Sequence, residues 1–158
     1  ATEDGALHAA TAESSARAAS AVPELLPVTL RDSATGLFRR TAGAGPPFHL
    51  ADQAATLAAL TDLEAAARFA DDIVAAFWDE EASAFRDRAG APTDPEALDL
   101  PQYPLEANAL AAGALARLGG GKRELARRCL ASFTDACYGQ GHAAARLALA
   151  VHASLTTG

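Results

Sequence analysis

The sequence predicts an all-α chain built as three αα-hairpins, and three observations support this prediction. Of the 158 residues, 43 are alanine, the residue with the highest helix propensity. Aromatic residues, which favour strands, make up only 6% of the chain. Apolar residues recur at the three- and four-residue spacing of one helix face in six segments. Because the length is typical of one domain, we expect a single helical domain over residues 1–158.

Three of the expected helices lie in the N-terminal half. The first covers about residues 6–30, where Pro23 and Pro27 are able to bend or end it. The second covers about residues 50–66, with leucines along one side. The third covers about residues 67–78 and carries an aromatic and β-branched stripe on one face.

The other three helices follow in the C-terminal half. One covers about residues 104–118 and is ended by the three glycines 119–121. The last two cover about residues 123–136 and 142–155. Paired in order, the six helices form hairpins that cover about residues 6–66, 67–118 and 123–155.

A repeated sequence pattern runs through the hairpins. Residues 32–39 (DSATGLFR) match residues 79–86 (DEEASAFR) at an offset of 47, with Asp, Phe and Arg in the same places. After a loop that is eight residues longer in the second copy, residues 50–54 match residues 105–109. A shortened third copy begins at Phe133. Repeats of this length are typical of stacked αα-hairpins.

Each repeat consists of an outgoing helix, a loop with a short extended Phe-Arg piece, and a returning helix. The matched positions predict that Arg39 and Arg86 pair with Asp32 and Asp79 across each turn. The three returning helices should begin at one rim of the molecule. Helix N-termini carry unpaired N–H groups and a partial positive charge, so polar residues at this rim are the candidates for a site.

Charge and composition exclude several classes of protein. The net charge is −7, and the one dense basic run, residues 122–128, alternates around a helix, so we expect no nucleic-acid partner. No apolar stretch reaches the roughly 18 residues that span a bilayer, and no signal peptide is recognisable, so we expect no membrane partner. Cys129 and Cys137 are too far apart on one helix for a disulfide, which favours reduced thiols and a cytoplasmic location.

Two carboxylates and a histidine at the rim are the candidate catalytic residues. His49 and Asp52 are three residues apart, and a carboxylate beside an imidazole raises its basicity, as a general base requires. Asp52 and Glu106 lie on successive rim helices and are the candidate carboxylate pair for glycoside hydrolysis. The simpler interpretation is that both acids only complement the positive helix N-termini.

Four other residues are candidates for ligand binding. Tyr103 and Trp78 are scarce aromatic residues on which a sugar ring could stack, although Trp78 also suits packing. Asn108 could bind a ligand hydroxyl or hold the neighbouring loop, and His142 begins the third rim helix. We predict no metal site, because His, Cys and carboxylates are nowhere at ligand spacing, and no cofactor, because nucleotide-binding motifs are missing.

Four stretches of the sequence resemble the helical part of a known family. In order, they are Pro47–Ala54 (PFHLADQA), Phe77–Glu81 (FWDEE), Ala84–Asp87 (AFRD) and Tyr103–Leu118 (YPLEANALAAGALARL). The family joins a thioredoxin domain to a six-hairpin region and includes the spermatogenesis-associated relatives. The resemblance spans about residues 46–155 and matches the C-terminal half of the helical region.

The sequence also departs from the family pattern. No thioredoxin-like part precedes the helices in this chain. Ser83-Ala84 stands where the family has Gly-Gly, and Leu105-Glu106-Ala107 stands where it has Ser-Gly between Pro and Asn. These differences weaken the transfer of family function to these positions.

The resemblance implies half of an (α/α)6 toroid, a fold similar to that of six-hairpin glycosidases and sugar epimerases. Three hairpins would form an open half-ring, half of a ring completed by a second copy, or a piece of a longer protein with a preceding thioredoxin-like domain. Our leading hypothesis is a non-catalytic binding or association protein. The alternative is a carbohydrate-directed enzyme of epimerase or glycosidase type, whose site for a sugar-like ligand is completed by dimerisation or by a missing N-terminal part.

Overall fold

The computed structural model describes residues 30–41, 48–89, 100–135 and 141–156. These ranges are predominantly helical, which confirms the expected helical character of the chain. The helices are α2 (Leu50–Ala59), α3 (Leu63–Phe77), α4 (Leu105–Leu118), α5 (Gly120–Ser132) and α6 (His142–Thr156). Four short strands accompany them: β1 (Phe48–His49), β2 (Trp78–Asp79), β3 (Ala84–Phe85) and β4 (Arg88–Ala89). Apart from Leu30, the helix expected over residues 6–30 lies outside the described residues, as does Cys137.

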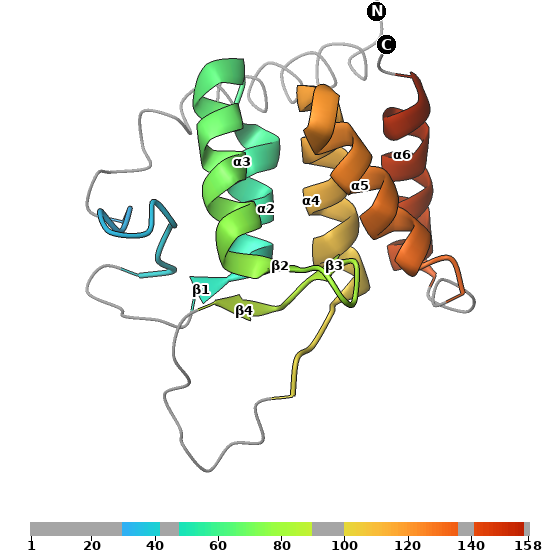
Figure 1. Cartoon of the computed structure of the whole chain (residues 1–158), viewed down its shortest axis with the longest axis horizontal. Coiled ribbons are helices and arrows are strands. Elements are labelled where there is room, and N and C mark those ends of the chain that lie inside the picture. The colour runs from blue at the N-terminus through green and yellow to red at the C-terminus, as the bar shows by residue number, and fades with distance from the viewer. Residues whose placement is uncertain (1–29, 42–47, 90–99, 136–140, 157–158) are drawn as a thin grey trace, which may run out of the picture.

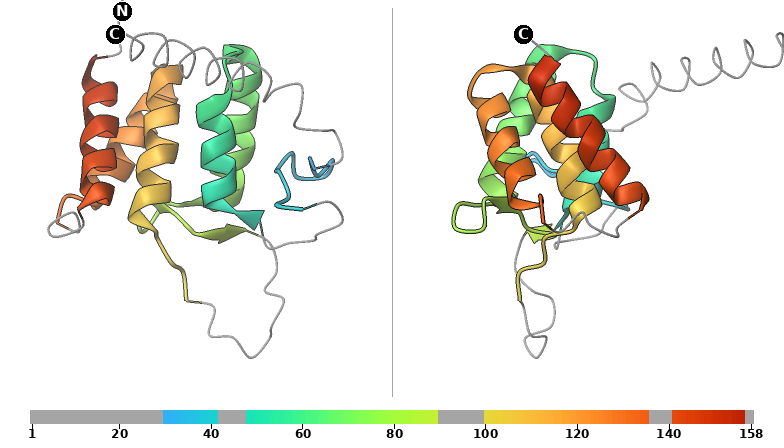
Figure 2. Two further views of the ribbon diagram at one scale, coloured as in Figure 1. Left: turned by 180° about the vertical axis from the view of Figure 1, so that it is seen from behind. Right: turned by 90° about the vertical axis from the view of Figure 1, so that its right-hand side faces the viewer.

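The helices form two layers (Figures 1 and 2). α2, α4 and α6 run in one direction and lie in one layer, whereas α3 and α5 run in the opposite direction in the other. α4 is the central helix, because it packs against α2, α5 and α6. The four strands lie at the end of the layers where α2 and α4 begin. Returning helices therefore begin at a common rim.

Alanines explain the central place of α4. Six of its alanines are buried, and Ala111, Ala112 and Ala116 are completely inaccessible to solvent. Small side chains let neighbouring helices approach closely. A methyl group added at Gly113 would lie 3.5 Å from the Cβ of Ala150 on α6, which shows how near the two helices come. The alanine content thus determines how tightly the layers pack.

The boundary between α2 and α3 differs from the sequence prediction. We expected helices over residues 50–66 and 67–78, but the chain leaves the helix at Leu60 and re-enters it at Leu63. Asp62 caps the new helix, because its carboxylate accepts hydrogen bonds from the N–H groups of Glu64 (2.9 Å) and Ala65 (3.3 Å). Leu60 and Leu63 continue the helical spacing across this turn, which conceals it in the sequence.

The glycine turn between α4 and α5 is tighter than expected. Gly119 alone separates the helices, and its φ of 72° is a conformation that other residues rarely adopt. α5 therefore begins at Gly120 instead of at about residue 123, and it ends at Ser132 instead of at about residue 136. The helices expected over residues 104–118 and 142–155 are present within one residue at each end.

The two loops that match in sequence also match in hydrogen bonding. Asp32 accepts from the N–H groups two and three residues later (3.1 and 2.9 Å), and Asp79 does the same (3.0 and 3.2 Å). The N–H of Arg39 donates to the carbonyl of Leu30 at 2.7 Å, and the N–H of Arg86 donates to the carbonyl of Phe77 at 2.9 Å. The repeat is therefore real in the backbone of both loops.

Ion pairs across the turns follow the same repeat. Arg39 pairs with Asp32, and Arg86 pairs with Asp79 at 2.7 Å, as the matched positions predicted. One position in each turn has a positive φ, at Gly36 (73°) and at its counterpart Ser83 (50°). The loop of the third copy is described only for residues 133–135, which form a turn after α5, and for Gly141, which precedes α6.

Candidate functional site

The predicted site residues all lie at the rim where the returning helices begin. His49 and Asp52 flank the start of α2, Glu106 and Asn108 lie in the first turn of α4, and His142 begins α6. Tyr103 precedes α4 and Trp78 follows α3. The expected clustering is thus correct at the level of the backbone. The side-chain contacts decide what each residue can do.

Asp52 is engaged by an arginine and makes no hydrogen bond to His49. Its two carboxylate oxygens accept from Nε (3.1 Å) and Nη2 (3.2 Å) of Arg40 in the preceding loop. This pairing raises the pKa of Arg40. His49 belongs to β1, where it lies opposite Arg88 of β4. The hypothesised imidazole–carboxylate pair is therefore not formed in the structure.

Glu106 lies near an arginine and a histidine of α6. One of its oxygens lies 2.9 Å from Nε of Arg146 in an ion pair, and the other lies 3.8 Å from Nε2 of His142. Glu106 and Arg146 are half-exposed, and the His142 side chain is 84% exposed. Two of the predicted site residues thus meet at the start of α4 and α6. This contact is open to solvent, so it is a weak ion pair that contributes at most about 1 kcal/mol.

Tyr103 joins the ion pair of the second loop. Its hydroxyl donates to Oδ2 of Asp79 at 2.9 Å, the oxygen that also accepts from Arg86. The Arg86 hydrogen bonds, followed by those from the backbone of Ala82 and from Tyr103, lower the pKa of Asp79 to about 2. Burial and the neighbouring carboxylate raise the pKa of Tyr103. Tyr103 therefore holds the loop, and its hydroxyl is not free.

Trp78 is half-buried and its polar edge is also occupied. Its ring meets Phe85 edge-on with centroids 4.9 Å apart, and its Nε1–H donates to Glu80 at 2.6 Å. The guanidinium of Arg128 on α5 lies over the ring, 5.4 Å from the centroid. A sugar stacking on that face would have to displace Arg128.

Asn108 is completely buried, and its amide is used inside the protein. Its Oδ1 accepts from the N–H of Phe85 at 2.7 Å and from the thiol of Cys129 at 3.3 Å. Its Nδ2 donates to the carbonyls of Phe85 (2.9 Å) and Pro104 (3.0 Å). Both amide hydrogens are satisfied, so the role as a loop anchor is the one that the geometry supports.

Gln53 does the same work in the first loop. It is completely buried, and its amide both donates to the carbonyl of Phe38 and accepts from its N–H, each at 2.8 Å. Phe38 and Phe85 are the matched phenylalanines of the repeat, 47 residues apart. The longer amide side chain of Gln53 and the shorter one of Asn108 therefore hydrogen-bond to the same backbone position in the two copies of the loop.

The paired carboxylates predict a loss of stability in acid. The pKa values of Asp32 and Asp79 are lowered to about 2, with the arginine of each loop as the largest cause. In the unfolded chain, the pKa of an aspartate is about 3.9. The stabilisation is therefore complete above about pH 4 and is lost as the pH falls to about 2.

This loss is measured by urea unfolding between pH 5 and pH 2. We expect Asp79→Asn to be less stable at pH 7 and to have a shallower decline in acid. Glu64→Gln is the matched control, because the Glu64 side chain is 82% exposed and pairs only within α3. An unchanged acid slope in Asp79→Asn would contradict the assignment.

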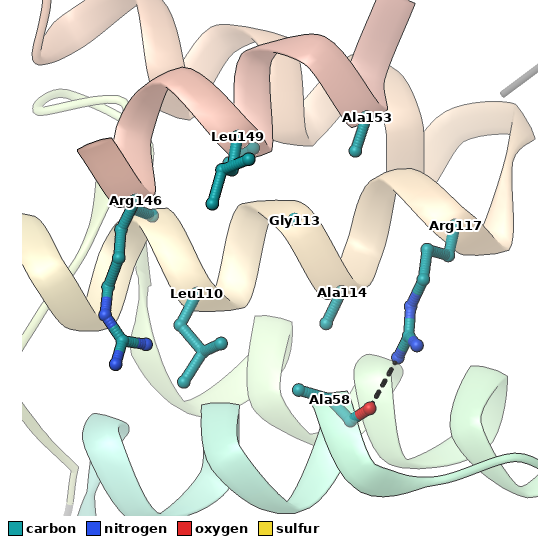
Figure 3. Close-up of a pocket in the computed structure, with 10 residues that line it drawn as sticks. Ala58, Leu110, Gly113, Ala114, Arg117, Arg146, Leu149 and Ala153 are labelled. Carbon is teal, nitrogen blue, oxygen red and sulfur yellow. Dashed lines mark hydrogen bonds between the residues drawn. The ribbon is translucent and has the colours of Figure 1, made fainter. Parts of the chain in front are cut away.

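A groove on the α2–α4–α6 layer is the main feature that the sequence analysis missed (Figure 3). It encloses a cavity of about 240 Å³, and its small lining residues are Ala58, Ala109, Gly113, Ala114, Ala150 and Ala153. Leu149 of α6 borders it and is 69% exposed. Arg117 lies at one end, where it donates to the carbonyls of Leu57 (3.3 Å) and Ala58 (2.9 Å), and Arg146 lies at the other. We call this surface the α4–α6 groove.

Helical spacing was the signal that could have revealed the groove. On α4, residues 106, 109, 110, 113, 114 and 117 share one face. On α6, apolar residues occur almost all round the helix, as is typical of a helix covered on more than one side. Of the α4 residues on this face, only Glu106 was singled out from the sequence, as a candidate catalytic acid.

Comparisons with other proteins complete the description of the site. No protein-family model, curated protein or solved structure matches this chain. Within the described ranges, no group of three or more His, Cys, Asp and Glu side chains is placed to hold a metal ion. None of the described helices is long and apolar enough to cross a membrane.

Proposed function

We propose that this chain is a non-catalytic association module, and that its helices are a section of an α/α-toroid similar to the six-hairpin family. The alternation of parallel returning helices in one layer and outgoing helices in the other supports the toroid. The repeated loops, which join each outgoing helix to the next returning helix, support it as well.

The state of the rim carboxylates carries the functional part of the proposal. Asp52 and Asp79 each accept hydrogen bonds from an arginine of this chain, and Glu106 forms an ion pair with Arg146. A general base or nucleophile needs a carboxylate that can reach a substrate, and such groups are usually distinguished by a perturbed environment. The rim side chains instead connect loops and helices. The α4–α6 groove, by contrast, is an open and apolar surface.

The carbohydrate-directed alternative rests on a different observation. Glu106 and His142 lie 3.8 Å apart and are accessible to solvent, so this pair could meet a ligand hydroxyl. The second carboxylate that glycoside hydrolysis requires would be Asp52, which is bound at both oxygens by Arg40. The alternative therefore needs Arg40 to release Asp52.

A thermal-shift panel of mono- and disaccharides separates the two functions. A ligand at one hundred times its Kd adds about 2.7 kcal/mol of stability, which for a domain of this size raises Tm by several degrees. We expect no sugar to raise Tm. A sugar that raises Tm in the wild type and not in Glu106→Gln would overturn the proposal and favour the enzyme.

A further inference from the structure

The α4–α6 groove is an apolar trough that runs along α4 between its two neighbours in the layer (Figure 3). Ala58 of α2 borders one side, Leu149 of α6 borders the other, and Ala114 of α4 lies between them. Apart from Arg117 and Arg146, the residues that line the cavity of about 240 Å³ are alanine, leucine and glycine. The trough exists because the two flanking helices pack mainly against α4, whose side chains here are small.

The two arginines at the ends of the groove differ in their charge balance. Arg146 is in an ion pair with Glu106, at 2.9 Å. Arg117 forms no ion pair within the described residues, whereas most arginines there do. Its Nη2 donates to the carbonyls of Leu57 (3.3 Å) and Ala58 (2.9 Å), which carry no net charge. One end of the groove is therefore neutralised, and the other keeps a positive charge.

The hydrogen bonds to α2 also hold the guanidinium of Arg117 in place. They use one nitrogen, so the N–H groups of Nε and Nη1 have no acceptor among the described residues. A carboxylate is the partner that these donors fit best, since hydrogen bonds between two charged groups are the stronger kind. In a chain with a net charge of −7, a cation without an ion pair beside an apolar groove favours an anionic ligand.

The dimensions of the groove favour a small ligand over a protein partner. The α4 residues that line it run from Ala109 to Arg117, about 12 Å of helix. With about 9 Å between neighbouring helices, the groove presents roughly 110 Å². A specific protein interface takes about 800 Å² from each partner. A single hydrocarbon chain, by contrast, needs only a strip of this width and length.

We infer that the α4–α6 groove binds an anionic amphiphile of fatty-acid type, whose carboxylate meets Arg117 and whose hydrocarbon chain lies along Ala114 toward Leu149. The chain supplies affinity by leaving water, and the ion pair fixes its direction. Because Glu106 already neutralises Arg146, the ligand has one charged end and not two. This inference goes beyond the proposed association function and does not depend on it.

A chain-length series of carboxylates tests the apolar part of the inference. Nuclear magnetic resonance titration of the isotope-labelled full chain with hexanoate, octanoate and decanoate suits the affinity, which an area of roughly 110 Å² places in the millimolar range. Transfer of one methylene group from water is worth about fourfold in affinity, and a groove open on one side gives about half of that free energy. We expect the dissociation constant to fall about twofold per added methylene, with shifts at the amides of Ala114, Arg117 and Leu149.

Arg117→Gln tests the contact with the charged end. An exposed ion pair is worth at most about fivefold in affinity, so we expect decanoate to bind up to about fivefold more weakly. Arg123→Gln is the matched control, because Arg123 also forms no ion pair within the described residues and does not line the groove. Decylamine, a cation with the same chain, should bind the wild type more weakly than decanoate and lose this disadvantage in Arg117→Gln. Circular dichroism checks that each variant keeps its helices.

Ala153→Leu tests the site of the hydrocarbon chain. Residue 153 lines the groove on α6, so three additional carbon atoms fill part of the space, and the dependence on chain length should become weaker. Ala145→Leu makes the same change at an exposed position of α6 outside the groove. It should bind all three carboxylates as the wild type does.

Each contrary result overturns the inference. The first is a titration without saturable shifts at the groove, as expected if another part of the chain already filled it. The second is equal affinity for decanoate and decylamine, which would mean that Arg117 does not select the charge. The third is an equal loss in the Arg117 and Arg123 variants. None of these results alters the saccharide panel, which depends on Glu106 and tests the proposed function separately.

Discussion

Replacing Asn108 with alanine is expected to lower the free energy of unfolding by about 4 kcal/mol, since each buried backbone group left without a partner costs about 1–3 kcal/mol. The substitution removes both partners of the completely buried Phe85 backbone, its N–H and its carbonyl. The carbonyl of Pro104 keeps a partner, because it also accepts from the N–H of residue 108. Urea unfolding at pH 7 measures the loss.

Gln53→Ala is the matched control for this prediction. Gln53 clamps Phe38 as Asn108 clamps Phe85, but Phe38 is half-buried, so its freed backbone groups can reach water. We expect the free energy of unfolding to fall by about 2 kcal/mol, because water can replace the lost hydrogen bonds to the N–H and carbonyl of Phe38. A loss at Asn108 no larger than that at Gln53 would contradict the argument that burial sets the difference.

Replacing Ala112 with leucine is expected to destabilise the protein by about 3 kcal/mol, the upper part of the range for overpacked cores. Ala112 is completely buried on α4, the central helix, which packs mainly against α2, α5 and α6. Three additional carbon atoms have no space there without moving a neighbouring helix. Thermal and urea unfolding of the purified variant measure the effect.

Ala145→Leu on α6 separates overpacking from a general effect of leucine. Residue 145 is exposed and helical, and leucine is nearly as good a helix former as alanine, so we expect a change below about 0.5 kcal/mol. Equal losses at positions 112 and 145 would mean that the close packing of α4 is not what limits side-chain size.

The repeated loops could be predicted from the sequence because local chemistry determines them. An aspartate that accepts from the N–H groups two and three residues later forms the same turn wherever it occurs. The matched Arg39 and Arg86 then reach their aspartates across that turn, as expected. The correct start of α4 after Tyr103-Pro104 has the same origin, since a proline-flanked segment directly precedes a helical apolar pattern.

Other features depend on residues that are distant in the sequence. The turn at Leu60–Asp62 interrupts a helical pattern that the leucines continue, and the sequence analysis placed the boundary several residues too late. The engagement of Asp52 by Arg40, and of Glu106 by Arg146, joins segments 12 and 40 residues apart. The spacing of residues within one helix does not predict ion pairs between segments so far apart in the sequence.

The predicted site shows the same division. Sequence reasoning gathered His49, Asp52, Glu106 and His142 at one rim, and the backbone places them there. Whether an acid at that rim is available or already paired depends on side chains from other elements. For Asn108, the two interpretations left open by the sequence are separated by its complete burial and four hydrogen-bond contacts.

The sequence by itself determined the helical character of this protein, the order of its described helices and the chemistry of its repeated loops. Those features follow from propensity, periodicity and hydrogen bonds between near neighbours, which are all local. Only the tertiary structure decided which carboxylates are paired and where an apolar groove remains. Both depend on how α2, α4 and α6 pack together. The alanines that permit this close packing do not indicate in the sequence which helix each of them will contact.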